Sequence, residues 1–328
     1  MLYSIHLLRF FAASILVIAQ VFNVIGVPKT VLVGDVGVDL FFIISGVAIG
    51  LSAKPGMSPI GFMVRRIIRV VPPYWLATFA TIALSYLWTK PVTPSFSDLW
   101  HSLLFIPAPS GFPILFPGWA LNFGMLFYCT FGALLWLCPK DAKPVCMIVM
   151  VSLATLAYAL ERPDLMRCVE FAMGLAIARP PSSNRPIGAL CIAAGLLALF
   201  MNRHGGAASG PFFWGIPCFL LVIGVTQFDD LPFLRGRTSA ILGDASYSIV
   251  LFHVPIMVTL QQAVIPLWMP AYYLWPTVIL MAAFAIIGGI VIDLAIIGPM
   301  TAGLRRAWRQ SGERRLVLQP GSDLVAGS

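Results

Sequence analysis

Three arginines between two apolar segments are the residues of this sequence whose type and spacing most readily suggest chemistry. Arg65, Arg66 and Arg69 precede a pair of prolines, Pro72 and Pro73. On a helix, the three arginine side chains fall within one arc of roughly 100°. Guanidinium groups bind phosphate oxygens through paired hydrogen bonds. The cluster is therefore either an anchor that orients the chain in a membrane or a clamp that binds an anion.

Five more ionisable residues lie within apolar stretches: Arg9, Asp39, Glu170, His253 and Asp293. Charge at membrane depth is costly, so such residues are functional candidates. A structural explanation is also open for three of them. Arg9 can extend its guanidinium to the lipid headgroups, Asp39 can pair within a helix bundle, and His253 can be a hydrogen-bonded core residue. For Glu170 and Asp293 we favour structural pairing.

The composition is that of an integral membrane protein. The chain has 328 residues, of which 59% are hydrophobic and 10% charged, whereas a soluble domain carries about a quarter charged residues. The net charge of +8 does not indicate nucleic-acid binding, because the basic residues lie between apolar segments rather than on one soluble face. The six cysteines form no C-x-x-C pair, so we expect neither a zinc site nor a disulfide framework.

Apolar runs of about 20 residues predict ten membrane-spanning helices, so the fold class is all-α, a polytopic membrane helix bundle. The predicted spans are 3–25, 32–52, 70–89, 118–138, 143–160, 165–179, 186–202, 210–228, 246–266 and 272–298. Residues 1–300 form one membrane domain, and residues 301–328 form a basic, flexible cytoplasmic tail. Proline tends to end or kink the preceding helix. We therefore expect the arginine cluster on a short segment of its own orientation before the span 70–89.

The positive charges support this count and predict an orientation. With ten spans and a cytoplasmic amino terminus, fifteen Lys and Arg residues fall in cytoplasmic segments and five in outer segments. An excess of positive charge marks cytoplasmic loops, so we expect both termini and the arginine cluster on the cytoplasmic side. The longest outer loop, residues 90–117, is either functional or a semi-rigid connector.

Five short motifs follow one another along the chain. They are L-R-F-F-A-A at 8–13, G-V-D-L-F-F-I-I-S-G at 37–46, R-I-I-R-V-V-P-P-Y-W at 66–75, G-W-A-L-N-F-G-M-L-F-Y at 118–128 and G-D-A-S-Y-S-I-V-L-F-H at 243–253. Together they resemble the acyltransferase-3 family of integral membrane proteins, which O-acylate polysaccharides and other envelope molecules. The motif at 118–128 resembles that of the exopolysaccharide acetyltransferase-like members. The resemblance covers about residues 3–300.

The resemblance implies a multi-pass O-acyltransferase of a bacterial inner membrane. It would move an acyl group, expected to be acetyl, from cytoplasmic acyl-CoA to a hydroxyl of a glycan or lipid-linked glycan. Acyl-CoA is then a donor substrate, and neither a permanently bound cofactor nor a metal is expected. The implied partners are the lipid bilayer and other polysaccharide-synthesis proteins, and not nucleic acid.

The resemblance also implies the site residues. The catalytic candidates are His253 and Asp39, with Gln20 at the position of the family's first-helix histidine. The substrate-binding candidates are Arg9, Arg66, Arg69, Trp119, Tyr128, Ser246 and Tyr247. Among these, Arg66 and Arg69 are expected to face the phosphates of the donor.

At three positions the sequence departs from the family pattern. Gln20 replaces a histidine, Gly124 a glutamate and Ile297 an acidic residue. A glutamine forms hydrogen bonds but cannot act as a general base. One hypothesis is therefore an active enzyme in which His253 supplies the missing base. Another is a catalytically degenerate relative that acts as a binding, scaffold or partner subunit in polysaccharide synthesis or export. A transporter is a third, more distant interpretation, because intramembrane charges also mark transport pathways.

Overall fold

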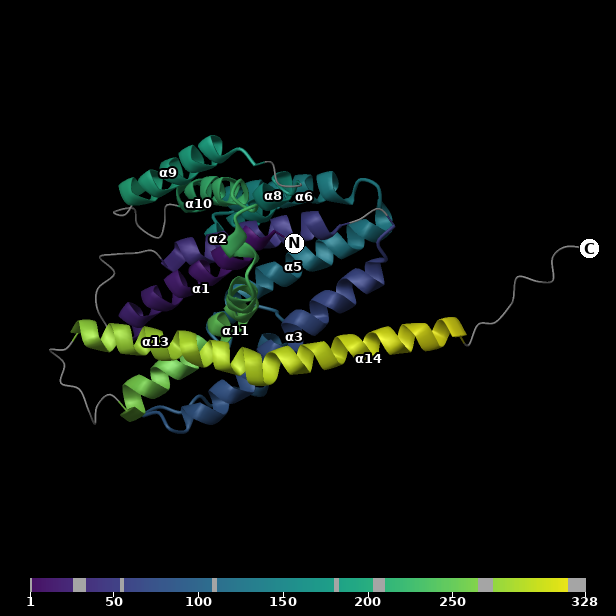
Figure 1. Cartoon of the computed structure of the whole chain (residues 1–328). Helices are drawn as coiled ribbons and strands as arrows, with labels where there is room; N and C mark the ends of the chain where they lie inside the picture. Colours follow the sequence, from purple (N-terminus) through teal and green to yellow (C-terminus); the bar gives the residue numbers. More distant parts are fainter. Residues whose placement is uncertain are drawn as a thin grey trace, which may run out of the picture.

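The computed structural model describes residues 2–25, 34–53, 56–107, 111–179, 183–202, 210–264 and 274–317, and these ranges contain helices and no strand (Figure 1). The helices are α1 (Tyr3–Val24), α2 (Gly34–Ser52), α3 (Pro59–Ser85), α4 (Phe96–Leu103), α5 (Gly118–Leu137), α6 (Ala142–Ala159), α7 (Pro163–Met166), α8 (Cys168–Ala176), α9 (Arg185–Met201), α10 (Gly210–Thr226), η3 (Pro232–Arg235), α11 (Arg237–Thr259), η4 (Leu260–Val264), α13 (Leu274–Ile292), η5 (Asp293–Ile297) and α14 (Gly298–Val317). Of the η segments, η3 is a 3-10 helix and the other two are π-helices.

The predicted polytopic helix bundle is confirmed. Within the described ranges, six helices are long and apolar enough to cross a membrane, and three shorter apolar helices accompany them. The centre of the bundle is α1, which packs against α2, α11 and α13. In Figure 1, α9 and α10 lie at the top of the bundle, and α13 and α14 lie below its centre. The long apolar segments of the sequence therefore form helices as predicted, and the structure differs from the prediction at three places.

The first change concerns the predicted span 165–179, which consists of the two short helices α7 and α8. The ammonium group of Lys143, near the start of α6, donates to the carbonyl oxygen of Ala178, just after α8, at 2.9 Å. This segment therefore returns the chain from the far end of α6 to the end where α6 began. The chain thus crosses the bundle here as two short helices and not as the one continuous helix that the sequence predicted.

The second change concerns the arginine cluster. The expectation of a short, separately oriented segment is wrong, because α3 runs continuously from Pro59 to Ser85 and contains both prolines. The helix begins at Ser58, whose hydroxyl accepts from the Gly61 N–H at 3.3 Å, a typical N-cap. Each proline removes one backbone donor, and the packing of α3 against α5 and α11 holds the helix together across that gap.

The third change is at the carboxyl end. A single helical run extends over 37 residues, Trp275–Ser311, whereas the sequence predicted a span ending at 298 and a flexible tail from 301. The π-helix η5 lies in this run, and the Gly298 N–H donates to the Asp293 carbonyl oxygen. This wider turn accommodates Pro299. In Figure 1, α14 continues the course of α13 and projects beyond the bundle. The part of the predicted tail at 318–328 lies outside the described residues.

Two glycines explain why α2 and α8 pack so closely. Gly46, the last residue of the motif at 37–46, faces Gly174 of α8 across the contact. A Cβ atom at Gly46 would overlap the carbonyl oxygen of Phe171, and one at Gly174 would overlap that of Ile43. Small residues allow helix backbones to approach closely within a membrane. The motif glycine is therefore a packing requirement.

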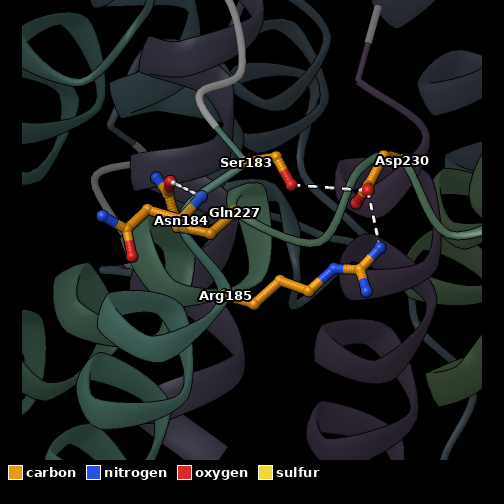
Figure 2. Close-up of polar contacts among 5 residues, drawn as sticks. All are labelled: Ser183, Asn184, Arg185, Gln227 and Asp230. Carbon is orange, nitrogen blue, oxygen red and sulfur yellow. Dashed lines mark hydrogen bonds and ion pairs between the residues drawn. The ribbon is translucent and has the colours of Figure 1, made fainter.

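A polar cluster joins the ends of α9 and α10 (Figure 2). Arg185 donates to the carboxylate of Asp230 at 2.7 Å, and the Ser183 hydroxyl lies 3.3 Å from the same oxygen. The backbone N–H of Asn184 donates to the side-chain oxygen of Gln227 at 3.3 Å. The hydrogen bond from Arg185 lowers the pKa of Asp230 below its ordinary value. These contacts join the start of α9 to the end of α10, and α10 packs against α2.

Candidate active site

A cavity of about 250 Å³ lies among α1, α2, α3, α5, α8 and α11. It collects eight of the ten residues that the sequence nominated for the site. These eight are Arg9, Gln20, Arg66, Arg69, Trp119, Tyr128, Tyr247 and His253. They come from four helices that are far apart along the chain, so their convergence is a property of the fold and not of the local sequence.

Each helix presents one face to the cavity because its lining residues recur at helical spacing. Residues three or four apart lie on the same side of a helix. The stripes are Leu16, Gln20 and Asn23 on α1, Leu121, Gly124 and Tyr128 on α5, and Tyr247, Val250 and His253 on α11. Arg9 and Gln20 are separated by 11 positions on α1, which corresponds to about 17 Å along the helix. The cavity is thus elongated, with arginines at one end and the Gln20 side chain at the other.

Three arginines line what we call the arginine end of the cavity: Arg9, Arg66 and Arg69. Arg66 donates to the Ser52 hydroxyl at 3.1 Å, and its guanidinium lies 5.6 Å from the ring centroid of Tyr128. Arg9 is only 9% exposed, so its side chain does not extend to the headgroups. These positive charges are enclosed by protein and face a cavity, which is the arrangement that binds an anion.

The position of Arg65 distinguishes it from its two neighbours. Arg65 is exposed, and it is absent from the described residues that line the cavity. The cluster therefore divides into one surface arginine and two cavity arginines. The anchor and clamp interpretations are compatible because they apply to different members.

Tyr247 connects α11 to the arginine segment of α3. Its hydroxyl donates to the backbone carbonyl oxygen of Val70 at 3.0 Å. Val70 directly follows Arg69, and the prolines at 72 and 73 leave the carbonyls of Ile68 and Arg69 without their usual helical donors. The hydrogen bond from Tyr247 thus holds the α3 backbone directly after the two carbonyls that lack helical donors.

The opposite end of the cavity, which we call the histidine end, contains His253, Gln20, Asn23 and Trp119. The Nδ1 atom of His253 lies 2.7 Å from the carbonyl oxygen of Val250. A carbonyl oxygen only accepts, so Nδ1 carries the hydrogen, and the neutral ring keeps its lone pair on Nε2. Nε2 is buried and has no hydrogen-bond partner within the part of the chain that the structure describes. This is the tautomer that can accept a proton.

Gln20 has a local partner at the histidine end. Its side-chain oxygen accepts from the Asn23 amide at 3.1 Å. Because the Gln20 side-chain oxygen already accepts this hydrogen bond, its amide N–H groups remain as donors in the lining of the cavity. The residue can therefore stabilise a negative oxygen but cannot remove a proton.

Asp39 and Ser246, which the sequence also nominated, are not among the described residues that line the cavity. Asp39 is fully buried and forms an ion pair with Arg167. The guanidinium of Arg167 lies 5.5 Å from the ring centroid of Trp119, so this pair contacts the histidine end from behind. The Ser246 hydroxyl donates to the Gly243 carbonyl at 2.7 Å within α11. Both side chains thus form hydrogen bonds or ion pairs inside the bundle.

Sequence reasoning missed Arg167, Asn23 and Phe116. Arg167 lies near the start of the predicted span 165–179, and no local pattern marks it as the ion-pair partner of Asp39. Asn23 carried a usable signal, because it lies three positions after Gln20 and therefore on the same helical face. Phe116 belongs to the stretch before α5 and lines the cavity together with Pro117. No periodicity marks such a loop residue. The favoured structural pairing of Asp293 is confirmed, since it accepts from the Ser248 hydroxyl at 2.6 Å.

Two comparisons with known proteins gave a match. A family model described as an acyltransferase domain matches residues 2–294. The chain is 32% identical over 241 residues to the exopolysaccharide production protein ExoZ of Rhizobium meliloti (strain 1021), a match that covers 67% of this chain and 76% of that protein. No solved structure gives a significant match.

Proposed function

The chain belongs to the acyltransferase-3 family of membrane proteins, and from this we propose that it transfers an acyl group from cytoplasmic acyl-CoA to a hydroxyl of an exopolysaccharide or its lipid-linked precursor. The observation that carries the proposal is the single cavity that joins three arginines to a histidine with a free Nε2. One end suits the anionic part of a donor, and the other suits proton transfer. The acyl group expected from the family resemblance is acetyl.

The donor is proposed to enter at the arginine end. Acyl-CoA carries several phosphate groups at one end and its thioester at the other, joined by a long flexible arm. Arg66 and Arg69, with Arg9 beside them, supply guanidinium groups for the phosphates. Arg9 and Gln20 lie roughly 17 Å apart along α1. This separation between the phosphate-binding end and the reaction end of the cavity corresponds to the separation of phosphates and thioester in the donor. This orientation places the arginine end toward the cytoplasm and both chain termini on that side.

The reaction is then an acyl transfer at the histidine end. The acceptor hydroxyl oxygen attacks the thioester carbonyl carbon, and its proton passes to Nε2 of His253. The N–H groups of Gln20 are the donors for the negative oxygen that develops. Collapse of the tetrahedral intermediate breaks the carbon–sulfur bond, and the proton held by His253 passes to the departing sulfur. The products are an ester and free coenzyme A.

A second candidate function has its own supporting observation. Gln20 engages Asn23, and Gly124 offers no side chain, so two proton-handling positions of the family are without an acid or base. In this alternative the chain binds the donor, or acts as a scaffold for other polysaccharide-synthesis proteins of a bacterial inner membrane. It does not catalyse acyl transfer. The name of the relative ExoZ, an exopolysaccharide production protein, is compatible with both candidates.

The deciding experiment measures acylation of the native glycan in a deletion strain that carries the wild type, His253→Gln or Gln20→His. The active-enzyme proposal expects normal acylation from the wild type and a loss of at least about 100-fold from His253→Gln, with acyl-CoA binding retained. His101→Gln, on α4 and away from the cavity, is the matched control. Acylation by Gln20→His alone would overturn the proposal and support the binding subunit.

A further inference from the structure

Gly124 differs from most of the helical glycines that the structure describes. At many of these positions, a Cβ atom would lie within 3.0 Å of an atom of a neighbouring helix; examples are Gly37, Gly188, Gly224 and Gly243. Those glycines are needed because the helices approach closely. A Cβ atom at Gly124 would meet no atom of the described residues within 4 Å. Close packing therefore does not explain this glycine.

Its location suggests a different reason. Gly124 lies within α5 (Gly118–Leu137) and lines the cavity. A glycine inside a helix is destabilising relative to alanine, and here no close helix contact requires it. What the missing side chain provides is volume that opens into the cavity. This volume is therefore available to a ligand bound in the cavity.

The walls on this side of the cavity are mostly apolar. On α5 the lining residues next to Gly124 are Ala120 and Leu121, and the ring of Tyr128 lies one turn further along. Val38, Phe42 and Phe171 line the cavity from α2 and α8, and the Phe42 and Phe171 rings lie 4.8 Å apart. The arginines that line the cavity come from α1 and α3. A hydrocarbon chain suits such walls, because its burial is favourable and it leaves no polar group unpaired.

We propose that Gly124 opens an acyl-chain subsite, so that the protein accepts acyl groups longer than acetyl. The inference rests on the proposed function, since it assumes that the occupant is the acyl part of a thioester donor. The occupant follows from continuity, because the same cavity supplies cations for the phosphates of that donor. Gly124 is then a specificity-determining residue whose contribution is the absence of a side chain.

The test measures dissociation constants of acetyl-CoA, butyryl-CoA and hexanoyl-CoA for the purified full-length protein in detergent. In the wild type, the two longer donors are expected to bind more tightly than acetyl-CoA. Gly124→Ala should weaken butyryl-CoA relative to acetyl-CoA by roughly 10-fold, the size of one methylene group in an apolar pocket. Gly124→Leu should increase that ratio further. Gly303→Ala on α14, where a Cβ atom also meets nothing, is the control and should leave the ratio unchanged.

The outcomes separate the subsite from the proposed function. Unchanged donor ratios in both Gly124 variants, or a wild type that prefers acetyl-CoA, would overturn the subsite while leaving acyl transfer intact. A wild type that binds none of the three donors would overturn both. Because the readout is binding, the subsite is tested even if glycan acylation is absent. Thermal unfolding of each variant confirms that a changed ratio comes from a folded protein.

Discussion

The hydroxyl of Tyr247 donates to the carbonyl oxygen of Val70 at 3.0 Å. This contact joins the motif at 243–253 to the motif at 66–75, which are separated by more than half of the chain. It positions the backbone directly after Arg69, where two prolines weaken the hydrogen bonding of α3. The two motifs are therefore parts of one structural unit.

Tyr247→Phe removes this hydrogen bond and little volume. We expect a loss of about 1 kcal/mol in the free energy of unfolding, because one buried hydrogen bond between two helices is lost. We also expect weaker acyl-CoA binding, since the arginine segment is less fixed. Thermal unfolding and a donor titration measure the two effects. Tyr86→Phe, at an exposed position after α3, is the control, and an equal effect there would contradict the assignment.

Arg66→Ala and Arg69→Ala should each weaken acyl-CoA binding by about 10-fold or more, because each removes a charge-assisted hydrogen bond of about 1.5–3 kcal/mol. Arg65→Ala should have little effect, since Arg65 is exposed and does not line the cavity. Isothermal titration of the three variants in detergent makes the comparison within one helix. Equal losses at all three positions would restore the interpretation of the cluster as a simple charge anchor.

The ion pair between Asp39 and Arg167 leads to a stability prediction. Asp39→Asn and Arg167→Gln each leave a buried charge without this partner, so each should cost about 3–5 kcal/mol. The double variant should cost less than the sum of the two. Unfolding of the single and double variants in one detergent gives the coupling. Strict additivity would show that the pair has no structural role.

Gly174→Ala tests the close contact of α2 and α8. Its Cβ atom would overlap the backbone of Ile43, so overpacking should lower the free energy of unfolding by about 1–3 kcal/mol. Gly303→Ala makes the same chemical change in a helix where the Cβ atom is unobstructed. It should be neutral or slightly stabilising, as helix propensity predicts. The difference between the two melting temperatures is the measurement.

The fold class was readable from the sequence because a bilayer demands long apolar helices. Two of the three differences from the sequence prediction lie at prolines. Local rules placed a break at Pro72, but packing on both sides of α3 kept the helix intact. At Pro299 a π-helix absorbed the proline. Such outcomes depend on neighbouring helices, which one segment of sequence does not specify.

Much of the site was also readable, since its residues lie in motifs with helical spacing. Asp39 shows the limit. Its position inside an apolar helix was predicted, but its partner Arg167 is 128 positions away. Only the fold decides whether such a carboxylate faces a cavity or a guanidinium. Gly124 shows a second limit. Its proposed role depends on the open volume next to it, and this volume is defined by the surrounding helices and not by the local sequence.

The run from Trp275 to Ser311 is 37 residues long, or about 56 Å as a helix, whereas the hydrocarbon core of a bilayer is about 30 Å thick. A large part of it must stand in water, and this part includes the exposed Arg305, Arg306 and Arg309. Since α14 packs against α3, their field reaches the helix that carries Arg66. Electrostatic steering by such charges raises the encounter rate of anions and declines with ionic strength. Under the proposed function, the arginines of α14 would therefore raise the rate at which an anionic donor reaches the cavity, although they do not line it.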